Sequence, residues 1–405
     1  MTTTDSRFFA RFFARCFAGS PVIARSLAML AACAFLAVPT SRAQAQVPAP
    51  EVAAHSWVLM DVTTHTMLYS QLPDERVEPA SLTKLMTAYV VFDWIEKKRL
   101  TLAQRPPVSN LAYKAIGSRM FVDPKAPATV EELLNGLIVQ SGNDAAIILA
   151  EAVGGSEPQF AEIMNAEAKR IGMTASNFTN SSGLPDPKHY STSRDLATLA
   201  VRLIEDFPEY YKMYSQKEYT YNKIRQPNRN RLLFTDPSVD GFKTGHTDAA
   251  GYCLISTAKR EQLDGAMPRR ILSVLMGASS ENSRAVESQK LLNYGFQNFD
   301  AVQLYKKGAS VGSYQVWKGS LPEVKVGFAQ DVLVTVPKSQ VANVKGEIER
   351  MEPLVAPIAA GQKIGTLRVR LGGNVISEVP AVALEAVAPA GWFGRTWDTI
   401  RLWIK

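Results

Sequence analysis

Ser81 and Lys84 are the first residues whose types and spacing could do chemistry. They lie in "EPASLTKLMTAYVVF", where Ser81 occupies an expected N-cap position and a helix is predicted from Leu82 to about Lys97. A capping serine is usually followed three residues later by Glu or Gln, whereas here a cation faces the positive helix terminus. Residues i and i+3 share a helix face, and lysine is a base only when neutral. The helix terminus and the apolar run behind Lys84 both favour the neutral amine.

The spacing alone is weak evidence, because Ser256 and Lys259 repeat it. That copy falls in an apolar, β-rich run, where positions i and i+3 point to opposite faces of a strand, so we interpret it as chance. Taken alone, Ser81 and Lys84 are also compatible with a capping serine followed by a solvated lysine. Other motifs are therefore needed to decide whether Ser81 and Lys84 form a catalytic pair.

Two later stretches supply further polar residues. "QSGNDAAI" places Ser141 and Asn143 between two predicted helices, and "VDGFKTGHTDAAGYC" places Lys243, Thr244 and Gly245 near the start of a predicted strand. Each has an ordinary structural explanation, a helix–helix turn for the first and an edge-strand lysine with a glycine bulge for the second. The three stretches together, in this order, favour one active site over three coincidences.

Other catalytic chemistries find little support. The four histidines, at positions 55, 65, 189 and 246, show no metal-ligand spacing, and no H-E-x-x-H motif occurs. The sequence has no Gly-rich phosphate loop after a strand and no G-x-S-x-G elbow. We therefore expect neither a metal nor a cofactor.

The order S-x-x-K, S-G-N, K-T-G resembles the motif set of the penicillin-binding proteins and serine β-lactamases. "PASLTK", "SGNDA", "DGFKTGHTDAAGY", "IRQPNRNRLL" and "RAVESQKLL" are similar to the low-molecular-mass D-alanyl-D-alanine carboxypeptidases of the penicillin-binding protein 5 and 6 type. The likeness covers nearly the whole chain after residue 45. It implies a serine-type hydrolase that removes the terminal D-alanine from peptidoglycan pentapeptide stems through an acyl-enzyme, and that β-lactams acylate.

The resemblance assigns roles to the matching residues. Ser81 would attack the carbonyl of the penultimate D-alanine, and Lys84 would accept its proton. Ser141 would relay that proton to the leaving D-alanine, and Asn143 would orient the substrate amide and the lysine. The backbone N–H groups of Ser81 and His246 would form the oxyanion hole.

The remaining matches concern charge and substrate binding. Lys243 would add positive charge near the serine of S-G-N and help keep the first-motif lysine neutral. Thr244 and Arg229 would hold the terminal carboxylate of the substrate. Gly245 completes the K-T-G motif, and Arg284 matches a family arginine near the site.

Three alternatives stay open. A class A β-lactamase would carry an E-x-x-L-N run between the second and third motifs, and "SSGLPDPKHYSTSRD" occupies a similar place without it. A DD-endopeptidase, which cuts cross-links, is not distinguished by these motifs. A non-catalytic, membrane-tethered cell-wall scaffold would not need the intact motif residues.

The predicted architecture is an α/β (α+β) domain of the serine β-lactamase and transpeptidase type over residues 46–298. Its early and late strands would share one antiparallel sheet, with helices between them. Short strands with turn residues predict a small all-β domain over residues 299–386. Residues 387–405 would form an amphipathic helix, with Phe393, Trp397, Ile400 and Ile404 on one face, which suits a membrane interface or a helix docked on the protein's own surface.

The N-terminus predicts export. Arginines precede the apolar run "SLAMLAACAFLAV", which is short for a membrane span, and a cleavage site follows at Ala43 or Ala45. A retained anchor and a lipoprotein modified at Cys33 are the alternatives. We expect the mature enzyme at the periplasmic face of the cytoplasmic membrane.

Charge and cysteine content agree with an exported protein that has no nucleic-acid partner. The 405-residue chain has a net charge of +7, and residues 1–45 carry five arginines and one acid, which leaves about +3 for the rest. After removal of residues 1–45 only Cys253 remains, so no intramolecular disulfide can form. It lies in "AAGYCLISTA" and is expected to be a buried small hydrophobe.

Overall fold

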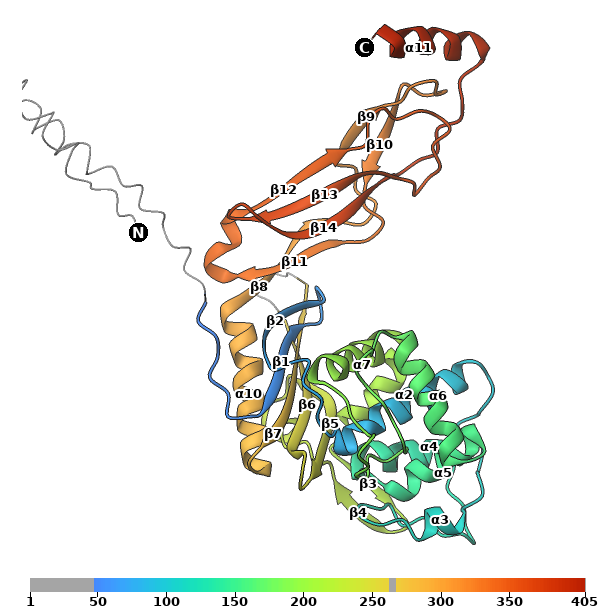
Figure 1. The fold of residues 1–405 in the computed structure, drawn as a ribbon, viewed down its shortest axis with the longest axis vertical. Coiled ribbons are helices and arrows are strands. Elements are labelled where there is room, and N and C mark those ends of the chain that lie inside the picture. Colours follow the sequence, from blue (N-terminus) through green and yellow to red (C-terminus); the bar gives the residue numbers. More distant parts are fainter. Residues whose placement is uncertain (1–46, 262–266, 405) are drawn as a thin grey trace, which may run out of the picture. The chain divides into compact units, whose positions relative to one another are not determined.

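The structure, a computed structural model, describes residues 47–261 and 267–404. The predicted export signal, residues 1–45, lies outside the described residues. A five-stranded antiparallel sheet in the order β2-β1-β7-β6-β5 is the centre of the α/β domain (Figure 1). The early hairpin therefore shares a sheet with the late strands, as the sequence predicts. The strands are β1 (Ser56–Asp61), β2 (Thr66–Gln71), β5 (Val239–Thr247), β6 (Gly251–Arg260) and β7 (Arg269–Ala278).

The sheet is covered on both faces because alternate strand residues point to opposite sides. Val58 of β1 joins the core formed with the helices, whereas Trp57 and Leu59 join a second core with Leu291 and Leu292 of α10. Helix α10 (Glu281–Asn298) runs along one face, where the short α9 (Leu232–Thr235) shares its core, and the other helices of this domain gather on the opposite side (Figure 1). They are α2 (Lys84–Glu96), α3 (Asn110–Tyr113), α4 (Val130–Asn135), α5 (Asn143–Gly154), α6 (Glu157–Arg170), α7 (Ser193–Asp206) and α8 (Pro208–Tyr211).

Helix α2 is buried on every side over its first nine residues, Lys84 to Phe92. A helix that is apolar all round must be enclosed by its neighbours, and α2 is the central helix of this core. A capping box formed by Thr129 and Glu132 opens α4. Helix α7 begins at Ser193, and the side chain that caps it belongs to Thr192.

The β domain follows α10 and is all-β, as predicted. A five-stranded sheet in the order β12-β13-β14-β10-β9 and the pair β11-β8 enclose a separate apolar core. Its strands are β8 (Phe299–Tyr305), β9 (Gly312–Gln315), β10 (Glu323–Gly327), β11 (Val332–Pro337), β12 (Val344–Arg350), β13 (Lys363–Leu371) and β14 (Asn374–Ala383). The last helix, α11 (Trp392–Ile404), follows a short connection. Within the described ranges, no helix combines the length and hydrophobicity needed to cross a bilayer.

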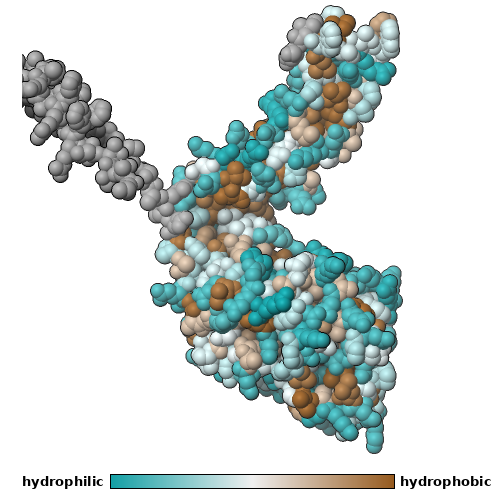
Figure 2. Space-filling view, in the orientation of Figure 1, coloured by the Kyte–Doolittle hydropathy of each residue, from teal (hydrophilic) through white to brown (hydrophobic). Residues whose placement is uncertain are grey.

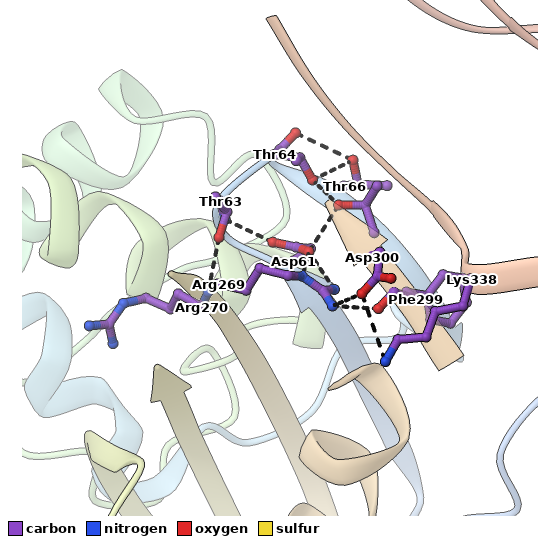
Figure 3. Close-up of polar contacts among 10 residues, drawn as sticks. Asp61, Thr63, Thr64, Thr66, Arg269, Arg270, Phe299, Asp300 and Lys338 are labelled. Carbon is purple, nitrogen blue, oxygen red and sulfur yellow. Dashed lines mark hydrogen bonds and ion pairs between the residues drawn. The ribbon is translucent and has the colours of Figure 1, made fainter. Parts of the chain in front are cut away.

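A buried ion pair lies where the two domains meet (Figure 3). The guanidinium of Arg269, at the start of β7, donates to Asp61 Oδ2 of β1 at 2.7 and 3.1 Å, and also to the backbone carbonyl of Phe299. From the β domain, Thr335 Oγ1 donates to the same carboxylate at 2.9 Å. One charged pair therefore holds β1, β7, β8 and β11 together.

Candidate active site

The first motif is formed by a single turn that leads into α2. Ser81 lies in the 3₁₀ helix Ala80–Thr83, and Lys84 is the first residue of α2. Ser81 is therefore not the N-cap, which corrects the sequence prediction: the tighter turn delays the helix by two residues, and Thr83 is the N-cap. The predicted contact is made, because Lys84 Nζ lies 3.0 Å from Ser81 Oγ.

Lys84 is held in a site that favours its neutral form. Its side chain is 1% exposed, and Nζ donates to the carbonyl of Ser182 at 2.6 Å. Burial, followed by the charge of Arg229, lowers the pKa of Lys84 from 10.5 to about 7, while Asp144 and Glu157 oppose the shift. Arg229 is the cation that acts on Lys84 most strongly, and the expected repulsion between Lys84 and Lys243 is among the causes that lower the pKa of Lys243. An amine with a pKa near 7 can accept a hydroxyl proton at neutral pH.

The second motif places Ser141 in a strained conformation. Ser141 ends the π-helical turn Gly136–Gln140 with φ 61°, in the left-handed region that residues other than glycine rarely adopt. Its buried Oγ has no hydrogen-bond partner in the part of the chain that the structure describes. Asn143 opens α5 and donates Nδ2–H to the carbonyl of Ile116 at 2.6 Å, so its amide is not bonded to Lys84. The unsatisfied hydroxyl is available to a bound molecule.

The third motif lies on the edge strand β5, against the first. A Cβ atom on Gly245 would lie 3.2 Å from the carbonyl oxygen of Pro79 and 3.3 Å from Ala80 Cβ. The absence of a side chain at Gly245 therefore lets the strand approach the Ser81 turn. Lys243 and Thr244 beside it are 3% and 4% exposed. Burial, and then the charges of Lys84, Arg229 and Arg284, place the pKa of Lys243 well below its ordinary value.

The comparisons with known proteins fit this geometry. Residues 42–280 match the family described as D-alanyl-D-alanine carboxypeptidase, and residues 299–389 match the C-terminal domain of penicillin-binding protein 5. The chain belongs to the D-alanyl-D-alanine carboxypeptidase family. It is 41% identical to the D-alanyl-D-alanine carboxypeptidase DacC of Escherichia coli over 93% of this chain and 95% of the relative.

Solved structures of this carboxypeptidase family have the same fold. Penicillin-binding protein 5 of Haemophilus influenzae is 38% identical, with a TM-score of 0.80 over 85% of this chain and all of that chain. Penicillin-binding protein 6B of Escherichia coli is 34% identical, with a TM-score of 0.69 over 83% of this chain and 97% of that chain. These matches confirm the family and the fold class that the sequence predicts.

The residues that the family resemblance added occupy different positions around the site. Arg229 is exposed on a loop whose two flanking asparagines, Asn228 and Asn230, are buried and hydrogen-bonded. His246 is exposed, with its ring 4.1 Å from the ring of Tyr252. Arg284 is 4% exposed, and its guanidinium lies 3.4 Å from the carbonyl oxygen of Gly245. Arg284 therefore contacts the third-motif strand, and the charge of Arg229 lowers the pKa of both buried lysines.

The loop that receives the Lys84 amine was not predicted from the sequence. Gly183 has φ 82°, and a Cβ atom there would lie 1.8 Å from the carbonyl oxygen of Ala80. The loop can therefore pack on the Ser81 turn and present the Ser182 carbonyl only with glycine at this position. The signal was present in "SSGLPDP", whose glycine between serines and proline predicts a tight turn.

His189 links the same loop to the Ser81 turn, a role not predicted from the sequence. Its Nδ1 accepts the backbone N–H of Thr179 at 3.1 Å, so the ring proton is on Nε2, which donates to Thr83 Oγ1 at 2.8 Å. Burial lowers the pKa of His189 to about 4, and the ring is therefore neutral at pH 7.

The two remaining sequence interpretations are borne out by burial. Ser256 is buried in β6 while Lys259 is exposed, so the second S-x-x-K does not form a pair. Cys253 is buried, and burial raises the pKa of its thiol to about 11, which makes it unreactive. The described residues contain no cluster of side chains that could hold a metal ion.

Proposed function

We propose that this protein is a serine-type D-alanyl-D-alanine carboxypeptidase that removes the terminal D-alanine from peptidoglycan stem peptides. The observation that carries the proposal is the 3.0 Å contact between Ser81 Oγ and a buried Lys84 whose pKa is about 7. Lys84 takes the proton of Ser81 as its oxygen attacks the carbonyl of the penultimate D-alanine. The C–N bond to the last D-alanine then breaks, and water releases the shortened peptide from the acyl-enzyme.

The other motif residues support this step. Ser141, with its free hydroxyl, relays the proton to the leaving amine, and Asn143 orients the substrate amide. Thr244 and Arg229 bind the terminal carboxylate, with Lys243 adding to the positive field. The N–H groups of Ser81 and His246 stabilise the oxyanion. Arg284 is a positioning residue that acts through the carbonyl of Gly245.

Labelled penicillin tests the nucleophile, since a β-lactam stands in for the D-alanyl-D-alanine end. Wild-type protein is expected to retain the label covalently, and Ser81→Ala to lose it. Release of D-alanine from a D-alanyl-D-alanine peptide tests the reaction itself. Covalent labelling of the Ser81→Ala variant would show that another residue is the nucleophile.

We also propose how the chain is divided into functional segments. Residues 1–45 are an export signal, 46–298 the catalytic domain, 299–386 a β-domain stalk and 387–405 the membrane-attaching helix, which places the enzyme at the periplasmic face of the cytoplasmic membrane. The support comes from α11, whose large apolar side chains face solvent: Trp392, Phe393, Trp397, Ile400 and Trp403 are 50–93% exposed.

One face of α11 already has a partner within the protein. Asp398 accepts the backbone N–H of Lys318 at 2.6 Å, and Leu402 lines a cavity with Tyr314 and Trp317 of the β domain. The exposed aromatic face remains for a lipid surface. Deletion of residues 390–405 should release the protein from membranes without loss of D-alanine release. A truncated protein that still sediments with membranes would contradict this attachment.

A further inference from the structure

We infer that a cavity between α11 and the β domain binds the headgroup of a phospholipid that carries a primary ammonium, as in phosphatidylethanolamine. The inference rests on the membrane attachment proposed above and deepens it, because it names the lipid. The cavity has a volume of about 370 Å³ and is lined by residues of β9 and β12, by the segments that follow these strands, and by Leu402 of α11. This volume is at the lower end of the range for ligand pockets, which suits a headgroup and not a whole lipid.

The orientation of α11 places the cavity at the level of lipid headgroups. Among the helix side chains that the structure describes, only Asp398 and Leu402 are half-buried, and both face the β domain. Trp397 and Ile400 face the other way and are 63% and 50% exposed. A helix is about 10–12 Å thick, and an interfacial helix lies about 5–10 Å deep in the boundary between headgroups and acyl chains. With its aromatic face on the acyl chains, the inner face and the cavity therefore lie among the headgroups.

Hydrogen bonds fix α11 against the β domain beside the cavity. The carbonyl of Lys318 accepts the backbone N–H of Ala390 at 2.7 Å, and the N–H of Lys318 donates to Asp398 at 2.6 Å. In Figure 2 hydrophobic surface continues from α11 onto the adjoining end of the β domain, where Figure 1 places β9. The helix and the β domain therefore form one site at the surface that would meet the lipid.

Two opposite charges at the cavity have no partner. The guanidinium of Arg350 lies 4.4 Å from the ring centroid of Tyr314 and forms no ion pair or hydrogen bond with the described residues. Glu352 lines the same cavity, and its carboxylate is equally without a partner in residues 47–261 and 267–404. Glu349, one residue before Arg350 on β12, is by contrast paired with Arg368 at 3.0 Å. The unpaired cation and anion therefore distinguish the cavity from the strand beside it.

The two charges match the two ends of an aminophospholipid headgroup. A guanidinium stacked on a ring keeps its N–H edge free, and it donates two parallel hydrogen bonds to a phosphate. A primary ammonium donates to a carboxylate such as Glu352, whereas the quaternary ammonium of a choline headgroup has no N–H to donate. Met351, which is 52% exposed, and Leu402 form an apolar wall for the glycerol and the first acyl carbons. The occupant is therefore a phospholipid with phosphate and primary ammonium together.

Vesicle binding by the full-length protein tests the cavity. Vesicles of phosphatidylcholine alone are compared with vesicles that also contain phosphatidylethanolamine, and the bound fraction is measured by sedimentation. We expect wild type to bind the second composition about tenfold more tightly, because one hydrogen bond between charged groups is worth a factor of about ten. Vesicles that contain phosphatidylglycerol instead measure the attraction of Arg395 and Arg401 to an anionic surface, which does not need the cavity.

Variants assign the preference to the two charges. Glu352→Gln should reduce the preference for phosphatidylethanolamine to about twofold, because a neutral amide accepts an ammonium more weakly, and it should leave the response to phosphatidylglycerol unchanged. Arg350→Gln should weaken binding to phosphatidylcholine and phosphatidylethanolamine by a similar factor, since both carry the phosphate. Glu349→Gln and Arg368→Gln remove the neighbouring paired charges and are the matched controls, which should bind as wild type does.

Equal binding of wild type to vesicles with and without phosphatidylethanolamine would overturn the inference. A preference that persists in full in Glu352→Gln would also overturn it, because the exposed face of α11 would then be its source. In both cases the attachment by α11 and the release of D-alanine would stand. Binding to none of the vesicles would instead remove the attachment and this inference together, while D-alanine release would persist.

Discussion

Lys84 and Arg269 are buried to the same degree, at 1% and 2% exposure, but their surroundings differ. Arg269 meets a carboxylate on its own sheet, Asp61, at 2.7 Å, and adds a backbone carbonyl. Lys84 meets a hydroxyl and a carbonyl, and none of the described carboxylates pairs with it. The paired guanidinium joins elements of the fold, whereas burial without an opposite charge lowers the pKa of an amine and lets it act as a base.

The Arg269 site and the Lys84 site also differ in their effect on stability. The Arg269 site joins strands of two domains and contributes to the folded state (Figure 3). The Lys84 site costs stability, because the amine gives up hydration without an opposite charge, and the surrounding core of α2 must offset that cost. Active sites are expected to break local rules of this kind.

Replacing Lys84 with methionine should give the largest change in activity. We expect D-alanine release to fall about 10²–10⁴-fold, because the base is lost, while the free energy of unfolding stays equal or rises. Between pH 7 and 10.5 the unfolded wild-type chain binds a proton that the folded chain has lost, so wild-type stability should rise with pH relative to the variant. Denaturant titrations at several pH values check this, and a strongly destabilised variant would contradict it.

Replacing Arg269 with methionine should give the largest change in stability. The variant leaves Asp61 buried without its cation, and we expect a loss of about 3–5 kcal/mol in the free energy of unfolding. Arg260→Met is the control, since the pair of Arg260 with Asp236 is partly exposed and should contribute less. Equal losses of unfolding free energy in urea for the two variants would contradict the idea that burial makes the pair of Arg269 with Asp61 the more important one.

Gly183→Ala should disturb the active site through packing. The added Cβ atom would meet the carbonyl of Ala80 at 1.8 Å, so the loop must move, and we expect a loss of about 1–3 kcal/mol in stability together with reduced penicillin acylation. Gly172→Ala is the matched control, because Gly172 also has positive φ but nothing lies within 4 Å of its Cβ position. Equal acylation by the two variants would show that the loop position is not limiting.

The pH dependence of penicillin acylation should report the protonation of Lys84, and it is the smallest of the four expected effects. We expect kcat/KM to fall about tenfold per pH unit below about 7, as the amine becomes protonated. Arg229→Gln removes a charge that lowers this pKa, so the acid limb should move to higher pH. Arg225→Gln removes an exposed arginine paired with Glu218 and should not move it. An acid limb that stays in place in Arg229→Gln would mean that Arg229 does not act on Lys84.

Much of the site could be predicted because its residues form short local motifs. The contact of Ser81 with Lys84 depends on three residues of separation within one turn, and the capping box of Thr129 and Glu132 is local as well. The failures were non-local. The Ser182 carbonyl, the contact of Gly183 with the Ser81 turn, and the Arg229 charge all depend on segments about 100 or more residues away in the chain.

The sequence by itself determined the motif order, the family, the fold class and the pairing of Ser81 with Lys84. Those follow from residue type and from spacing within single elements. Only the tertiary structure decided that the pKa of Lys84 falls to about 7 and that Arg269 has a carboxylate partner. Lys84 is buried without a carboxylate partner among the described residues, whereas Arg269 meets the carboxylate of Asp61, 208 residues away in the chain. Burial and charge pairing belong to the packed fold, so no local pattern could supply them.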